Sequence, residues 1–466
     1  MARMAWLTKS RFLSGLQCPK RLWREVHEPL AEPPPPSAQL LNGRRFDALV
    51  RALRPGTCVA RGEGGLPAAL AATERLRREG WPSIVHQPAF RAGELAVIAD
   101  LVTTRGASAT LTEVKAATGP RPEHVPDLGF QALVLRRARF AVDRTLVLHV
   151  DPAFALRTPG DYAGLIAEAD LTAAVEEALP SLEESAARLL AVMNGATRPA
   201  IRTGAHCRAP WTCPFLTDCQ AEEGGTPAAP VKVRRRAQRA LVERAIANGR
   251  SAFDAAATHT LRALSPPFAY LDFETVGWAV PEVIGTRPYE PWPFQWSLHV
   301  EAVDGSVRHA GYLCAGDVSD AATLAAELLA ALPDDGPVFA YNASFERGVL
   351  LQLAGRLPDQ ADALRAAAAR LFDLLPVTRR AWYHTDMQGS WSIKSVLPTI
   401  APELDYARFD AVRNGEDAQG AFLESRAPET PPGRRAVLRA ALLRYCERDT
   451  WALVVLRRFL CGAAPA

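Results

Sequence analysis

The chain has 466 residues, 48% of them hydrophobic, and a formal net charge of +3. This length allows two or three domains with their own cores, and the composition excludes a fibrous or wholly disordered protein. The small net charge is uninformative about nucleic acids, because a basic groove and acidic metal sites cancel in the sum. No run of eighteen apolar residues occurs, and Met1–Arg11 lacks the apolar core of a signal peptide, so we expect a cytoplasmic protein that does not bind membranes.

The first half of the chain has the pattern of an α/β domain. Short runs rich in Val, Ile, Leu and Thr over Gln87–Lys115 predict a β-hairpin that turns at Arg105-Gly106. Helical periodicity follows over Leu128–Phe140, a strand is expected at Thr145–Val150, and Leu165–Met193 indicates one or two helices. This alternation of strands and helices predicts an α/β fold for residues 1–222.

The expected hairpin carries a D…ExK pattern formed by Asp100, Glu113 and Lys115. Glu113 and Lys115 lie two residues apart in a strand and so share one face, on which Asp100 from the neighbouring strand can converge. A metal ion held by the two carboxylates could activate water there, with the lysine stabilising charge on a phosphate. The pattern therefore predicts a candidate catalytic centre, although D…ExK also occurs by chance.

Four of the eight cysteines have a spacing that indicates a common ligand. Cys18 stands near the start, whereas Cys207, Cys213 and Cys219 follow one another at C-x5-C-x5-C spacing. Four thiolates are the ligand set of a [4Fe-4S] cluster. A zinc site made by His206 and the three late cysteines is the alternative, because those four ligands are local in the sequence.

One early cysteine and a late trio that flank D…ExK resemble the iron-sulfur nucleases of the RecB family, which have a restriction-endonuclease-like, PD-(D/E)XK fold. The resemblance spans residues 7–220, and it implies that the cluster joins the two ends of the domain. It also makes Gln131 a candidate site residue. The relatives usually space the late trio as C-x2-C-x5-C, so the first gap differs here.

Two other positions depart from that family's pattern. Asp47, in the expected helix Gly43–Arg51, stands where relatives tend to carry a metal-binding histidine. Leu135 stands four residues after Gln131, where relatives carry a tyrosine. The resemblance thus implies the fold of this half, and the departures bear on its nuclease activity.

A change to Gly, Thr, Pro and Ala over Glu222–Pro230 indicates a domain boundary. We expect a helical linker over residues 223–265 and a second α/β domain over residues 266–462. The elements expected at its start are, in chain order, strands Phe268–Phe273, Gln295–Val300 and Gly311–Leu313, helix Ala321–Leu332 and strand Val338–Tyr341.

Acidic residues of this domain form a second candidate centre. Asp272 and Glu274 lie two residues apart near the end of the first strand, so both point to one face of the sheet. Two-metal cleavage of phosphodiesters needs such a carboxylate cluster to hold Mg²⁺ or Mn²⁺. Glu346 is expected in the first turn of a helix, while Tyr445 and Asp449 share one face of another. The phenol of Tyr445 could orient a metal-bound water without adding charge.

These residues resemble the three exonuclease motifs of the DnaQ-like, DEDD superfamily, in its tyrosine-bearing branch. The DxE motif matches Asp272 and Glu274, and the YxxxD motif matches Tyr445 and Asp449. The second motif is usually NxxFD and reads Asn-Ala-Ser-Phe-Glu here, ending at Glu346. The resemblance covers most of the domain and implies an RNase H-like fold with 3′ to 5′ exonuclease chemistry.

Two further residues are candidates for the same centre. Asp373 stands where related enzymes often carry another acid, so it could complement or replace Glu346, and a helix cap is the alternative. Lys394 ends the segment Gly-Ser-Trp-Ser-Ile-Lys, in which a loop enters a helix and could hold a phosphate. A structural turn is the alternative there.

The sequence thus predicts a RecB-like domain fused to an RNase H-like exonuclease domain, an order that resembles an uncharacterised bacterial domain family found alone or fused to helicases. The expected activity is metal-dependent hydrolysis of terminal phosphodiesters in DNA or RNA, with a second cleavage site at D…ExK as a further hypothesis. The competing hypothesis is that one or both folds have lost catalysis and serve as a nucleic-acid-binding or assembly module of a repair or defence complex.

Overall fold

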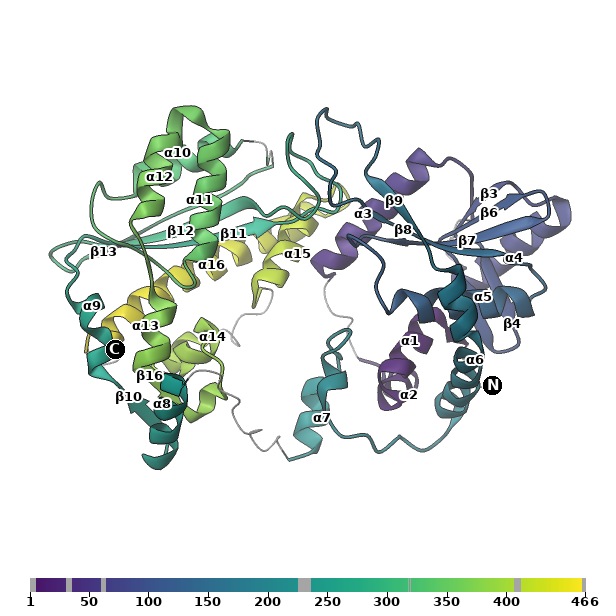
Figure 1. The fold of residues 1–466 in the computed structure, drawn as a ribbon, viewed down its shortest axis with the longest axis horizontal. Helices are drawn as coiled ribbons and strands as arrows, with labels where there is room; N and C mark the ends of the chain where they lie inside the picture. Colours follow the sequence, from purple (N-terminus) through teal and green to yellow (C-terminus); the bar gives the residue numbers. More distant parts are fainter. Residues whose placement is uncertain are drawn as a thin grey trace. The chain divides into compact units, whose positions relative to one another are not determined.

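The computed structural model describes residues 6–30, 36–59, 64–224, 236–316, 318, 320–405 and 412–462. The chain is a mixed α/β protein with several sheets, and it divides into two compact units (Figure 1). The first unit comprises Met1–Pro35 and Asn42–Thr226, and the second comprises Pro36–Leu41 and Pro227–Ala466. Among the described residues, no helix is both long and apolar enough to cross a membrane.

The first unit contains a six-stranded sheet in the order β2-β3-β6-β7-β8-β9. The expected hairpin is present as β6 and β7, which pair antiparallel and turn at Gly106, where φ is 62° and glycine has no steric penalty. The chain then crosses over through a helix, because β7 and β8 run parallel. The strands are β2 (Thr57–Cys58), β3 (Ile84–His86), β6 (Leu101–Arg105), β7 (Ser108–Lys115), β8 (Arg144–Val150) and β9 (Ile166–Asp170).

A smaller sheet, in the order β1-β5-β4, completes the strands of this unit. It consists of β1 (Leu7–Thr8), β4 (Ala89–Ala92) and β5 (Leu95–Ile98). The segment predicted as one or two helices at Leu165–Met193 instead begins with β9, which pairs antiparallel with β8 and forms the end of the larger sheet. Apolar spacing alone did not separate a short strand from the helix that follows it.

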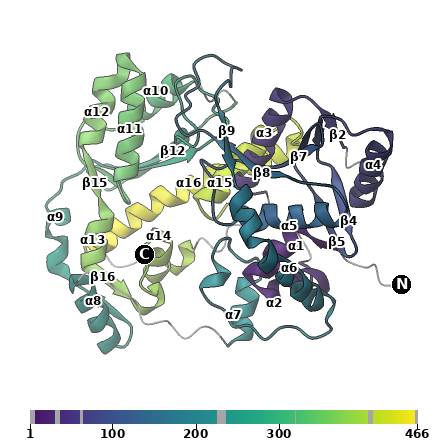
Figure 2. The ribbon, with the colours of Figure 1, turned by 45° about the vertical axis from the view of Figure 1, so that its right-hand side comes forward.

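Helices of the first unit gather beside β7 and β8 (Figure 2). Phe12 and Phe130 stack with their ring centroids 4.3 Å apart, which fixes α1 against α5. A Cβ atom at Gly129 would lie 2.3 Å from Cδ1 of Leu182, so the Leu182 side chain of α6 packs directly over Gly129 of α5. The helices are α1 (Lys9–Gln17), α2 (Pro19–His27), α3 (Ala38–Leu53), α4 (Gly65–Glu79), α5 (His124–Arg137), α6 (Thr172–Asn194) and α7 (Leu216–Glu222).

The second unit contains a five-stranded sheet in the order β13-β12-β11-β14-β15, in which β11, β12 and β13 are antiparallel while β14 and β15 run parallel to β11. Helices α10, α11 and α12 cover one side and α16 crosses the other (Figure 1). The elements are β11 (Phe268–Val276), β12 (Trp292–Glu301), β13 (Val307–Leu313), α10 (Ala321–Ala331), β14 (Val338–Ala340), α11 (Ser344–Arg356), α12 (Ala361–Ala369), β15 (Leu371–Asp373) and α16 (Pro432–Leu460).

The register of β11 and β12 determines which residues face α16. Asp272 pairs with Ser297 and Glu274 pairs with Gln295. Ser297 is hydrogen-bonded to Thr450 of α16 at 2.8 Å, and the Gln295 amide donates to the Leu442 carbonyl at 2.9 Å. Since paired residues share a face of the sheet, Asp272 and Glu274 also face α16.

The described part of the expected linker belongs to the second unit. It forms α8 (Arg236–Ala247), β10 (Ser251–Phe253) and α9 (His259–Arg262), while the basic residues 231–235 lie outside the described residues. Leu241 and Leu261 are buried in the core of the unit, and β10 pairs antiparallel with β16 (Trp382–His384). The segment expected as a helical linker over 223–265 thus contains helices α8 and α9, and between them a strand whose partner lies much later in the chain.

Candidate functional site

Carboxylates from two elements of the second unit converge on one point. Asp272 and Glu274 come from β11 and Asp449 comes from α16, and one oxygen of each lies within 4.8 Å of the others. Within the described ranges this is the only group of three or more acidic, histidine or cysteine side chains that is close enough to share a metal ion. The i and i+2 spacing thus places Asp272 and Glu274 on one face of the sheet, as the sequence predicted.

Glu346 adds a fourth carboxylate from the first turn of α11. The residue is 3% exposed, and its Oε2 is buried without a hydrogen-bond partner among the described residues. Burial raises the pKa of Glu346 to about 8. An orphaned buried carboxylate oxygen is costly unless a cation or a donor reaches it, so Glu346 fits the role of a ligand despite its extra methylene.

The electrostatics of the cluster are those of acids without enough counter-charge. Burial, followed by the charges of Asp449 and Glu274, raises the pKa of Asp272 well above its usual range. Burial and Asp449 also raise the pKa of Glu274 to about 8, with Lys394 opposing them. Metal-free carboxylates in this state retain protons near neutral pH, and a divalent ion would favour their ionised forms.

Tyr445 and Lys394 lie together beside the carboxylates. The Lys394 ammonium donates a hydrogen bond of 2.8 Å to the Tyr445 hydroxyl and one of 2.7 Å to the carbonyl of Arg413. Lys394 belongs to α14 (Ile393–Val396), which is only one turn long. Its contacts with Tyr445 and its influence on Glu274 make it part of the candidate site rather than of a structural turn alone.

Asp373 caps a helix, which was the alternative to a metal-binding role. Its Oδ1 accepts hydrogen bonds from the backbone N–H groups of Leu375 and Asn342, both at 2.9 Å. The first bond caps α13 (Leu374–Ala381). The second fixes the turn at Asn342, where φ is 68°, immediately before the helix that carries Glu346. Asp373 thus supports the position of Glu346 from outside the three-ligand group.

Cys446 is a neighbour of the cluster that the sequence did not single out. Its Sγ lies 3.6 Å from Oδ2 of Asp272. Burial, then Asp272 and Glu274, raise the pKa of the Cys446 thiol well above its usual range. The group therefore stays protonated and can donate to Asp272. Its position three residues before Asp449, on the same helix face, was the available signal.

The four cysteines singled out by spacing line one pocket in the first unit, of about 300 Å³ including space open to solvent, together with His206. Cys18 precedes α2, Cys207 and Cys213 lie in the loop after α6, and Cys219 lies on α7. The Gln17 amide donates to the carbonyls of His206 and Trp211 at 2.8 and 2.6 Å, which attaches that loop to α1.

The donors that line this pocket are thiols and an imidazole, which are ligands for an iron-sulfur cluster or for zinc. Tetrahedral zinc with Zn–S bonds of about 2.3 Å brings its sulfur ligands to about 3.8 Å from one another. Among the described residues, no three of His206, Cys18, Cys207, Cys213 and Cys219 approach within 4.8 Å. In a cluster of four irons, by contrast, each thiolate binds a different metal.

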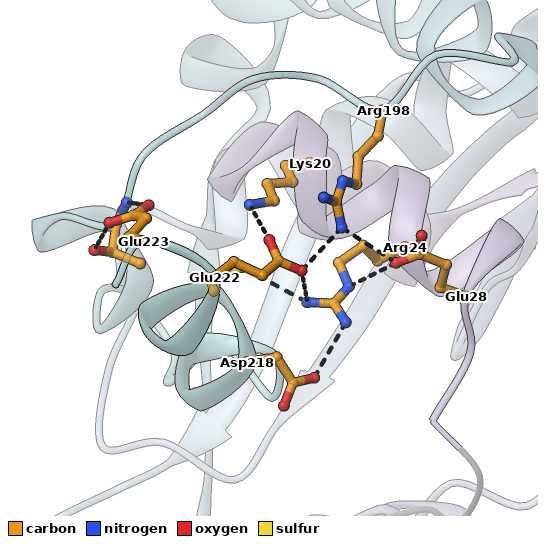
Figure 3. Close-up of polar contacts among 9 residues, drawn as sticks. Lys20, Arg24, Glu28, Arg198, Asp218, Glu222 and Glu223 are labelled. Atoms are coloured by element: carbon orange, nitrogen blue, oxygen red, sulfur yellow. Dashed lines mark hydrogen bonds and ion pairs between the residues drawn. The ribbon is translucent and has the colours of Figure 1, made fainter. Parts of the chain in front are cut away.

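Ion pairs join α2 to α7 beside this pocket (Figure 3). Lys20 lies 3.1 Å from Glu222, and Arg24 lies 3.1 Å from Asp218. Arg24 also donates to the sulfur of Cys219 at 3.7 Å. Helices from the two ends of the unit are therefore held together by side chains, and the basic residues offset the negative charge that thiolates would bring.

The D…ExK residues also meet, with two partners that the sequence did not reveal. Glu113 accepts hydrogen bonds from Lys115 and from Lys9 of α1, both to Oε1 at 2.8 Å. Asp127 of α5 accepts from Lys115 at 2.6 Å. Gln131, a candidate site residue in the sequence, donates to Glu113 at 2.7 Å and to Asp127 at 2.9 Å.

The charges of this centre are largely balanced by the lysines. Burial opposes ionisation of Glu113, but Lys115 and Lys9 together hold its pKa below its usual range. Asp100 accepts a hydrogen bond from the Val114 N–H at 3.0 Å, and burial together with Glu113 raises its pKa to about 7. The residues as arranged do not fit a metal site, because ammonium and amide groups occupy both Glu113 oxygens.

Asp47 does not take part in a metal site with Asp100 and Glu113 among the described residues. It lies on α3, where its Oδ2 is 3.0 Å from the Arg51 guanidinium one turn later. A helical i,i+4 partner thus satisfies the carboxylate at this position, where the sequence departs from the family's pattern.

A family model described as a domain of unknown function (DUF2779) matches residues 269–392. The matched segment includes Asp272, Glu274 and Glu346 and ends before Tyr445 and Asp449. No curated protein matches the chain.

Proposed function

We propose that this protein is a metal-dependent nuclease that hydrolyses phosphodiester bonds of DNA or RNA in its second unit. The observation that carries the proposal is the convergence of Asp272, Glu274 and Asp449. Glu346, whose charge acts on Asp272, adds a buried oxygen without a hydrogen-bond partner among the described residues. Carboxylates confined together in this way need cationic counter-charge. Phosphodiester hydrolysis is the chemistry for which such clusters, with Mg²⁺ or Mn²⁺, are suited.

Asp272, Glu274 and Asp449 would hold the divalent ions, which supply Lewis-acid polarisation of the phosphate and activation of water when bound. The Tyr445 hydroxyl accepts a hydrogen bond from Lys394, and a phenol can also donate its own proton. We assign Tyr445 the role of donating that proton in a hydrogen bond to the attacking water. The Lys394 ammonium offsets negative charge on the scissile phosphate. The resemblance to tyrosine-type DEDD exonucleases extends this proposal to an RNase H-like fold and 3′ to 5′ polarity.

The proposal for the first unit is a RecB-like fold that holds a [4Fe-4S] cluster in the cysteine pocket. The pocket places all four predicted cysteines together with Lys20 and Arg24 nearby. Anaerobically purified protein should contain about four iron and four sulfide per chain, and Cys219→Ser should lower both. Stoichiometric zinc without iron would show that the pocket is a zinc site.

End-labelled single- and double-stranded DNA and RNA, incubated with the purified full chain and Mg²⁺ or Mn²⁺, test the nuclease proposal. We expect release of nucleoside monophosphates, and loss of this product in Asp272→Asn and Asp449→Asn. Asp362→Asn is the matched control, because Asp362 lies in the same unit with a fully exposed side chain. Absence of metal-dependent products from every substrate would favour the non-catalytic alternative, in which the chain binds nucleic acid within a helicase-containing repair or defence complex.

A further inference from the structure

The D…ExK centre of the first unit contains a lysine that its sequence pattern does not include. Lys9 places its ammonium 2.8 Å from Oε1 of Glu113 and 3.6 Å from Oδ1 of Asp127. Lys115, the lysine of the pattern, is also 2.8 Å from Oε1 of Glu113 and is 2.6 Å from Oδ2 of Asp127. Two ammonium groups therefore share the same pair of buried carboxylates.

Lys9 is held in this position by backbone and core contacts. The strand before it, β1, pairs in parallel with β5, so that Leu7 and Thr8 lie beside Leu95 and Ala96. Four residues after Ala96 the chain reaches Asp100. The stacking of Phe12 on α5 fixes the other side of α1 against the helix that carries Asp127 and Gln131. Lys9 thus enters the centre as a consequence of how α1 packs.

The remaining carboxylate oxygens have partners as well. Gln131 donates to Oε2 of Glu113 at 2.7 Å and to Oδ1 of Asp127 at 2.9 Å, and the Val114 N–H donates to Oδ2 of Asp100 at 3.0 Å. A hard divalent ion takes oxygen ligands and needs them free of ammonium donors. Binding such an ion to Glu113 would require two ammonium groups to leave the oxygen they share.

We propose that Lys9 is the resident cation of this centre, and that its ammonium takes the place of a divalent ion and keeps the D…ExK residues free of metal. Three carboxylates and two lysines leave at most a single net negative charge there. The inference concerns only first-unit residues and does not rest on the function proposed for the second.

Isothermal titration with Mn²⁺ tests this in the full chain carrying Asp272→Asn and Asp449→Asn, which removes the second unit's acidic group. We expect no Mn²⁺ site in this background and none after Lys9→Arg, which keeps the charge. Without Lys9, only the Lys115 ammonium would have to move from Oε1 of Glu113 for an ion to bind, so Lys9→Met should create one site. Glu113→Gln added to Lys9→Met should abolish it. Circular dichroism shows that each variant is folded, and Lys9→Leu, which likewise cannot donate to Glu113, replaces Lys9→Met if the latter unfolds.

Two results would overturn the proposal. Mn²⁺ binding in the background that disappears with Glu113→Gln alone would show that a metal displaces Lys9 in the natural centre. A folded Lys9→Met or Lys9→Leu variant that binds no Mn²⁺ would show that Lys9 does not exclude metal. Failure of the nuclease proposal would leave both readouts unchanged, because they report metal binding to Glu113 and do not depend on cleavage.

Discussion

Replacing Glu274 with glutamine should stabilise the metal-free second unit at high pH. Glu274 is 8% exposed, and burial together with Asp449 raises its pKa from 4.5 to about 8. The folded state therefore binds more protons than the unfolded state between these values, so stability is full below about pH 4.5 and is lost as the pH rises toward 8. At about 1.4 kcal/mol for each pH unit, the loss has an upper limit of about 5 kcal/mol.

The gain from Glu274→Gln should be smaller than this limit, at roughly 2–3 kcal/mol, since a buried amide without full hydrogen bonding costs about 1–3 kcal/mol. Hydrogen–deuterium exchange of peptides from β11 and α16, in the presence of EDTA, reports the second unit separately from the first. Wild-type protection should fall between pH 5 and pH 8 after correction for intrinsic exchange, and the variant should keep most of its protection. With divalent metal present, the wild type should be more protected than the variant, because only the wild type retains the Glu274 carboxylate as a ligand.

Asp362→Asn provides the matched control, because its fully exposed side chain should not couple to the cluster. Equal protection of wild type at pH 5 and pH 8 would refute the reasoning, as would a Glu274→Gln protein that is less protected than wild type at pH 8 without metal. Either result would mean that the carboxylates of the cluster do not repel one another in the folded protein.

Two further substitutions separate chemistry from support in the same site. Tyr445→Phe should lower kcat by roughly 10–100-fold with little change in Mn²⁺ affinity, because it removes the proposed hydrogen bond to water and no metal ligand. Single-turnover cleavage and Mn²⁺ titration measure the two quantities. An unchanged cleavage rate would exclude a role of Tyr445 in orienting the water. Asp373→Ala should destabilise the second unit by about 1 kcal/mol through loss of the α13 cap while Mn²⁺ still binds, as urea unfolding and titration would show. Loss of all Mn²⁺ binding there would make Asp373 a ligand instead.

The parts of the candidate sites that could be predicted are those encoded by local periodicity. Asp272 and Glu274 share a strand face, and Tyr445 and Asp449 share a helix face, so spacing alone indicated that each pair acts together. Lys9 could not be found in this way, since it reaches Glu113 only through the pairing of β1 with β5. Asp373 was ambiguous because capping and metal binding both favour an aspartate at the start of a helix.

Segments with weak periodicity were misjudged for a related reason. β9 and β10 are five and three residues long, and strands of this length are specified by their partners more than by their own sequence. β9 needs β8 beside it, and β10 needs β16, which follows much later in the chain. The sequence analysis therefore assigned β9 to the helices expected over Leu165–Met193 and did not identify β10 within the expected linker.

The two acidic centres show how similar residues can have opposite affinities for metal. In the second unit, Asp272, Glu274 and Asp449 lie close together, the buried Oε2 of Glu346 lacks a hydrogen-bond partner among the described residues, and Lys394 is hydrogen-bonded to Tyr445. In the first unit, lysine ammonium groups contact the carboxylates directly. The balance between carboxylates and tethered cations, more than the presence of a D…ExK or DxE pattern, should therefore decide which centre takes Mg²⁺ or Mn²⁺.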